Sequence, residues 1–163
     1  GIVTAPLKLL CYMILLAMVS GFVIQGLLNI RIPAGETDVE RETGRIMLAI
    51  ASIQQGAPRN LLYSDASIGS TRVIEVNLPE SIAYLSLGGD PDDLKAGRMI
   101  VYQIKGCGKH VEYVDISISA ASRDERGVAV PSGRGLLLKS GRYLLTFELV
   151  HNPASGERLV IVY

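Results

Sequence analysis

Two groups of side chains in this sequence have residue types and spacings that could bind a metal ion. Cys107 and His110 are separated by two residues, and thiolate and imidazole are the usual zinc ligands. No second pair completes a tetrahedral set, so we interpret the segment as a solvent-facing hairpin. The run Gly88-Gly89-Asp90-Pro91-Asp92-Asp93 carries three carboxylates, which calcium prefers. It lacks the ligand spacing of an EF-hand, which favours a solvated turn.

No arrangement of residues predicts catalysis. His110 and His151 lie in separate segments, and the sequence holds neither a CxxCH haem motif, a GxSxG elbow nor a phosphate-binding loop. We therefore expect a protein that is not an enzyme, with no catalytic residue, no cofactor and no metal. The chain has 16 basic and 16 acidic residues, and this balance argues against nucleic-acid binding.

One apolar segment explains the positive mean hydropathy of +0.32. Leu9–Ile30 contains no charged residue, and as a helix it would span roughly 33 Å, enough to cross the hydrocarbon core of a membrane. Three interpretations compete for it: a cleaved secretory signal, a simple membrane anchor and an arm that packs among identical helices. A cleaved signal would have a shorter apolar region with a small-x-small site after it, whereas this stretch ends in Asn29-Ile30-Arg31-Ile32-Pro33. The chain begins with Gly1 rather than Met, which favours prior removal of a leader and so the third interpretation.

The elements after the apolar segment divide into a helical stretch and a β-rich stretch. Pro33-Ala34-Gly35 predicts a helix break, and Thr37–Gln55 predicts a helix whose buried face carries Val39, Ile46, Ile50 and Ile53. From Arg72 onward the pattern alternates as in strands, with Val114, Ile116 and Ile118 facing the core. Hairpins are predicted at Gly106–Gly108 and Ser140-Gly141, and a turn at 152–156 leads into a last strand.

These patterns predict an α+β chain with three parts. Residues 1–32 form the hydrophobic helix, 33–58 its amphipathic continuation, and 59–163 an antiparallel, immunoglobulin-like β-sandwich. The charges flanking the apolar segment (Lys8 before it, Arg31 and then four acids after it) favour a cytoplasmic N-terminus and an extracellular β domain.

An N-terminal apolar helix, an amphipathic continuation and a β domain together resemble the layout of type IV pilins. The segment 52–90, in which a helix gives way to a strand ending in Leu-Pro, a second strand and Gly-Gly, is similar to archaeal proteins with class III signal peptides. This resemblance implies processing by a prepilin peptidase at or beside Gly1 and assembly by an ATPase and platform. Bacterial pilins carry a glutamate at the fifth mature position, where this chain has Ala5 or Pro6; archaeal pilins commonly lack that acid.

The sequence and the resemblance together lead to two expected functions. One is a structural subunit of a surface filament that serves adhesion or motility, membrane-inserted before assembly and then a helical homopolymer. The alternative is a membrane-anchored accessory module that does not polymerise. Small residues such as Ala17, Ser20, Gly21 and Gly26 predict a seam for close helix packing. The full set of predicted assembly residues is Leu9, Leu10, Tyr12, Ile14, Leu15, Ala17, Met18, Ser20, Gly21, Phe22, Ile24, Gly26 and Leu27.

Overall fold

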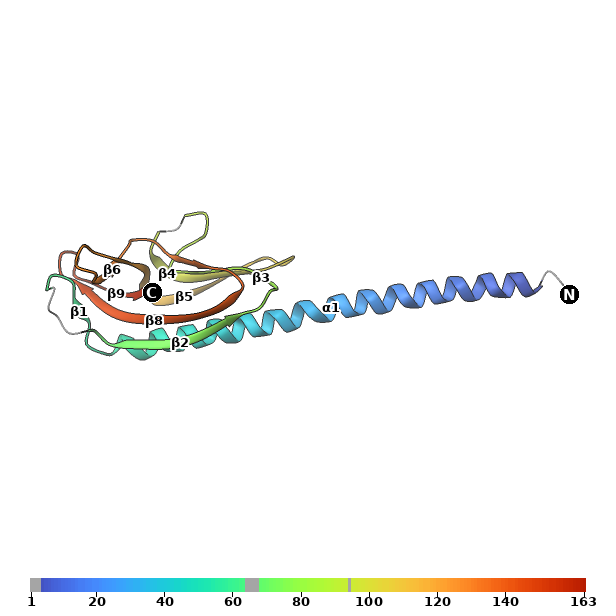
Figure 1. Ribbon diagram of the computed structural model, residues 1–163, viewed down its shortest axis with the longest axis horizontal. Helices are drawn as coiled ribbons and strands as arrows, with labels where there is room; N and C mark the ends of the chain where they lie inside the picture. The colour runs from blue at the N-terminus through green and yellow to red at the C-terminus, as the bar shows by residue number, and fades with distance from the viewer. Residues whose placement is uncertain (1–3, 64–67, 94) are drawn as a thin grey trace. The chain divides into compact units, whose positions relative to one another are not determined.

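Within the residues that it describes, the computed structural model of this chain contains one helix and nine strands (Figure 1). It describes residues 4–63, 68–93 and 95–163, with side chains for 6–27, 35–63, 68–93 and 95–163. The elements are α1 (Thr4–Gln54), β1 (Arg59–Asn60), β2 (Thr71–Leu78), β3 (Ile82–Leu87), β4 (Gly97–Ile104), β5 (Lys109–Arg123), β6 (Ala129–Pro131), β7 (Leu136–Leu138), β8 (Gly141–Asn152) and β9 (Glu157–Val162). An N-terminal apolar helix followed by a sheet domain is therefore the architecture of the chain.

The chain forms two compact units, Gly1–Glu36 and Thr37–Tyr163. We call the second unit the head. The rear part of α1 belongs to the head, because its apolar face packs into the same core as the strands. Val39, Ile46, Ile50 and Ile53 are all buried, which confirms the predicted face of this helix.

The helix is continuous in secondary structure where a break was predicted. α1 runs through Pro33 and Gly35 without a gap. Proline removes one main-chain donor from a helix, and the turns on either side can hold the helix together when nothing else interrupts them. A bend at this position stays a prediction.

The head contains one curled, mixed sheet, so the predicted antiparallel immunoglobulin-like sandwich is not confirmed. The strand order is β1-β8-β9-β5-β4-β3-β7, with β2 paired to β8 and β6 paired to β5. Two of the pairings, β1 with β8 and β5 with β9, are parallel. The rear part of α1 covers the inner face of the sheet, so the core closes without a second sheet.

The predicted hairpins have different outcomes. β4 and β5 form the expected antiparallel pair around Gly106, whose φ of 82° suits a tight turn. β8 and β9 also pair across the turn at 152–156. The hairpin predicted at Ser140-Gly141 is wrong, because β7 pairs with β3 while β8 pairs with β2 and β9. The residues of a turn do not determine which strands the two flanking strands pair with.

The core of the head is apolar and joins the helix to the strands. Its largest fully buried side chain is Phe147 of β8, and Ile116 and Ile118 of β5 lie in the same cluster with Val114 packed against it, as predicted. The short strands β1 and β6 were not predicted. Their sequences, Arg-Asn and Ala-Val-Pro, are too short to show an alternating pattern.

Candidate functional site

The exposed front of α1 is the strongest candidate for a functional surface. The segment Pro6–Leu27, which we call the arm, is long and apolar enough to cross a membrane, and none of it is buried. A signal sequence near an N-terminus has the same length and composition. Continuous helix forms here because Leu, Met and Ala have high helical propensity and no charge or proline interrupts them after Lys8.

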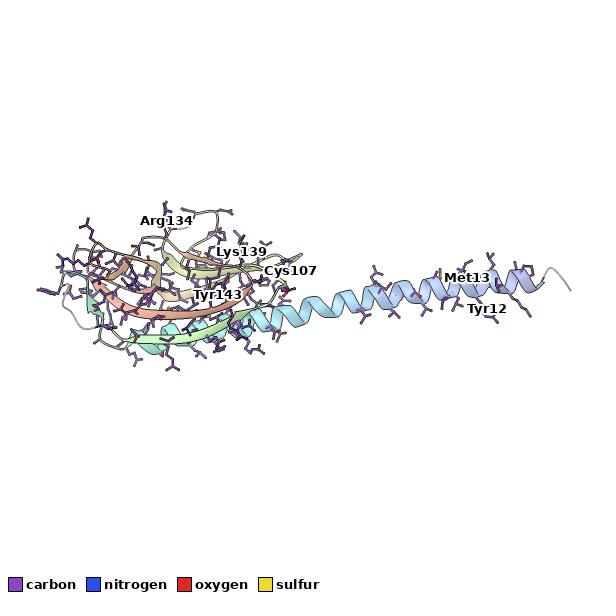
Figure 2. All side chains as sticks on the ribbon, viewed as in Figure 1. Tyr12, Met13, Cys107, Arg134, Lys139 and Tyr143 are labelled. Carbon is purple, nitrogen blue, oxygen red and sulfur yellow. The ribbon has the colours of Figure 1, made fainter. Side chains whose placement is uncertain are left out.

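Every predicted assembly residue lies on this exposed surface. Phe22 is 75% exposed and Tyr12 72%, the largest fractions among the large apolar side chains of the arm, and even Val19 is 50% exposed. Figure 2 shows side chains projecting from both sides of the helix, with Tyr12 and Met13 among them. A soluble protein rarely leaves so large a continuous apolar surface uncovered, so the arm requires lipid or other protein around it.

The arm has a grooved face of large side chains and a face of small residues. A shallow apolar groove of about 410 Å³ lies along one side, lined by Leu9, Tyr12, Met13, Leu15, Leu16 and Val19. Ala17 and Gly21 are one turn apart and so share a face. A Cβ placed at Gly21 or at Gly26 would meet no atom within 4 Å. Groove and small residues together give surfaces that another helix can approach closely.

The polar groups of the arm are few. The hydroxyl of Ser20 donates to the carbonyl oxygen of Leu16 at 2.8 Å, so it is satisfied within the helix. It therefore adds little polarity to the surface. Lys8 is the one charged side chain between Pro6 and Leu27. Its amino group can reach a headgroup region from the end of a membrane helix.

Some predicted positions lie outside the described residues, and some exposed residues were missed. The predicted processing junction at Gly1 lies outside the described residues, and the side chain of Pro33 is not described. Five further apolar residues are at least half exposed and belong to the same surface: Leu7, Met13, Leu16, Val19 and Val23. The apolar run Leu9–Ile30 already indicated all of these except Leu7, because no helix face in it is polar.

The two groups with metal-binding residue types have other partners in the head. The imidazole of His110 stacks on the ring of Tyr102, with the ring centroids 5.0 Å apart and the planes at 5°. Cys107 is a free thiol packed against the core. Among the described residues, no three His, Cys, Asp or Glu side chains are grouped so that they could hold a metal ion.

Lysines pair with the carboxylates of the 88–93 loop. Lys109 Nζ lies 2.8 Å from Asp90 Oδ2 and 3.7 Å from Asp92 Oδ2, and Lys95 lies 3.6 Å from Asp93. The hydrogen bond from Lys109 lowers the pKa of Asp90 and raises the pKa of Lys109 itself. The two pairs with Lys109, the first residue of β5, thus hold the loop to that strand.

Comparisons with protein-family models, with curated proteins and with solved structures found no match. The function proposed for this chain therefore depends on its geometry and on the patterns in its sequence.

Proposed function

We propose that this chain is a structural subunit of an archaeal type IV pilus-like surface filament, which polymerises through the arm. The main support for the proposal is that the whole arm is exposed, although the head already buries its own apolar core without it. In a filament, copies of the arm would cover one another. Before assembly the same surface would lie in the membrane, with the head outside.

The packing properties of the arm favour its association with other helices in a bundle. Apolar helices gain no hydrophobic free energy from meeting each other in lipid, so packing quality decides whether they associate. The groove at Leu9–Val19 and the small residues Ala17 and Gly21 offer such packing. The proposal includes processing by a prepilin peptidase and extraction by an assembly ATPase and platform, as the resemblance implies, and it includes no enzymatic activity.

The competing proposal is a membrane-anchored module that does not polymerise. It uses the same exposed arm, with lipid as its permanent cover. The two proposals differ in the final surroundings of the arm, which are copies of itself in a filament and lipid in an anchored module.

Shearing cells of the source organism and identifying the sheared material tests the proposal. Electron microscopy should show filaments, and mass spectrometry should identify this chain as a main component of them. If the chain stays in the membrane pellet and no filament contains it, the anchored module replaces the filament subunit.

A further inference from the structure

The head contains a small pocket beside α1 whose charged residues are both acids. We call it the acidic pocket. It measures about 210 Å³, and α1, β4 and β5 supply its lining: Glu40, Thr43, Gly44, Met47, Tyr102 and Glu112. Because Glu40 and Glu112 come from different elements and no basic residue is in this lining, the pocket attracts a cation.

Neither acid of the acidic pocket has a counter-charge within its own head. The neighbouring acids on α1, Asp38 and Glu42, pair with arginines at 3.1 and 2.9 Å. In the part of the chain that the structure describes, no ion pair or hydrogen bond joins the side chain of Glu40 or Glu112 to another group. Both side chains are exposed and so can be reached by a partner.

A buried hydroxyl in the same lining also lacks a partner. Thr43 is 3% exposed, and its Oγ1 makes no hydrogen bond with any described residue. Thr43 shares one face of α1 with Glu40 and Met47, which are three residues before it and four after it. A buried polar atom without a hydrogen bond is unfavourable, so the pocket has bonding capacity that the head itself leaves unused.

The remaining walls suit an ammonium group on an apolar stem. Met47 and Gly44 offer no charge, and the ring of Tyr102 attracts a cation. The imidazole of His110 stacks on that ring but is not in the lining. A metal ion fits less well, because no three His, Cys, Asp or Glu among the described residues are grouped to hold one. A lysine side chain has three donors on a flexible stem of four carbons.

The arm carries an ammonium group that needs such a site once it leaves the membrane. Lys8 is the one charged side chain between Pro6 and Leu27, and the first acid of the sequence is Glu36. In a membrane its amino group reaches the headgroups. Among apolar arms it would lose them, and a buried ammonium without a counter-charge is strongly unfavourable. The counter-charge must therefore come from beyond the arms.

We propose that the acidic pocket of one copy binds the ammonium of Lys8 from another copy, with Glu40 and Glu112 as its counter-charges. This inference rests on the filament proposed above. At 1.5 Å per residue the path along α1 from Lys8 to Glu40 is roughly 48 Å, so the pair joins different copies. Each copy has one such ammonium and one such pocket, and a contact of this heterologous kind repeats in an open helical filament.

Carbodiimide treatment of sheared filaments, followed by mass spectrometry of the digested chain, tests this pairing. The reagent joins an amine to a carboxylate as an amide without a spacer, so it links groups that are in contact. We expect a peptide that joins Lys8 to Glu40 or Glu112, together with covalent multimers on a denaturing gel. The pair of Lys109 and Asp90, which lie 2.8 Å apart within one head, is the internal positive control.

A second measurement neutralises the acidic pocket and leaves the arm unchanged. The double variant Glu40→Gln with Glu112→Gln should lower the amount of sheared filament at least about tenfold, because the ammonium loses its counter-charges. The chain should still enter the membrane, and the head should still fold because both side chains are exposed. Glu80→Gln with Glu125→Gln removes two exposed acids outside the lining and should assemble normally.

The outcomes separate this inference from the filament proposal. Filaments of this chain in which Lys8 is linked to neither acid would overturn the inference alone. Normal assembly of the pocket variant, or an equal loss in its control, would do the same. A link from Lys139, an exposed lysine of the head, to Glu40 would mean that the pocket takes a different amine, which also overturns it. If no filament contains the chain, the filament proposal fails and this pairing fails with it.

Discussion

Arg158 of β9 caps the end of α1 by donating from Nη2 to the carbonyl oxygen of Gln54 at 2.9 Å. The same nitrogen donates to the carbonyl oxygen of Gly56 at 3.0 Å. The last carbonyls of a helix have no partner within the helix, and a cation near them also interacts favourably with the helix dipole. A residue 104 positions away in sequence thus ends the helix and ties it to the sheet.

Replacing Arg158 by Met should destabilise the head modestly. The side chain is exposed, so we expect a loss of about 0.5–1 kcal/mol in the free energy of unfolding. Chemical denaturation of the full chain in detergent, followed by tyrosine fluorescence, measures this loss. Arg126→Met is the matched control, because within the described residues the structure records no hydrogen bond from the guanidinium of Arg126, and it should leave the midpoint unchanged. Equal effects of the two variants would contradict the capping role.

The pairing of Arg59 with Glu148 should show strong coupling between the two residues. Glu148→Gln leaves a buried guanidinium without its counter-charge, so we expect a loss of about 3–5 kcal/mol in unfolding free energy. The double variant Arg59→Met with Glu148→Leu removes both charges and should recover most of that loss. A double-mutant cycle by denaturation, which compares Arg59→Met, Glu148→Leu and the variant carrying both, measures the coupling. Additive losses would show that the two side chains stabilise the head independently.

Gly88 and Gly127 should respond differently to the same substitution. Both have positive φ, 91° and 78°, so alanine is strained at either position. A Cβ at Gly88 would also approach the main-chain carbonyl of Ile118 at 2.1 Å, whereas a Cβ at Gly127 would meet nothing within 4 Å. Gly127→Ala should therefore cost about 1 kcal/mol, and Gly88→Ala clearly more. Thermal unfolding of the two variants provides the comparison, and similar melting temperatures would be the contrary result.

Acid should remove the contribution of the Lys109–Asp90 pair. The folded-state pKa of Asp90 lies below its ordinary value of 3.8 because Lys109 donates to it. A lowered carboxyl pKa stabilises the fold above the ordinary value, and this contribution is lost as the pH falls through the folded value. Asp90→Asn should therefore be less stable than the native chain at pH 7, and the difference should shrink below pH 3.8. Denaturation midpoints across this range measure it, with Asp115→Asn as a control. A difference that does not change with pH would exclude the pair as its cause.

Substitution in the arm should separate membrane insertion from assembly. Gly21→Leu enlarges the face that Gly21 shares with Ala17, and it keeps the arm apolar. We expect the variant to remain in the membrane fraction and to form no filaments. Phe22→Leu changes the most exposed of the large apolar side chains in the arm without filling the small-residue face, and it should assemble normally. Electron microscopy of sheared material distinguishes them, and normal filaments from Gly21→Leu would refute the seam.

Local patterns in the sequence are enough to predict the helix and most strands of this protein. The charge-free run at Leu9–Ile30 and the spacing of Val39, Ile46, Ile50 and Ile53 are such patterns, and their period indicates which face must be buried. The strands β2, β3, β4, β5, β7, β8 and β9 were predicted for the same reason. Each alternates or forms an apolar run, and each is bounded by turn residues.

Strand pairing and the burial of polar residues depend instead on contacts between distant segments. Alternation tells which side chains face the core, but it carries no information on partner or direction. That is why the parallel pairing of β5 with β9 and the separation of β7 from β8 were not predicted. Arg59 and Glu148 are 89 positions apart, and each is an ordinary charged residue in its own segment. They are buried because the curled sheet brings β1, β6 and β8 together.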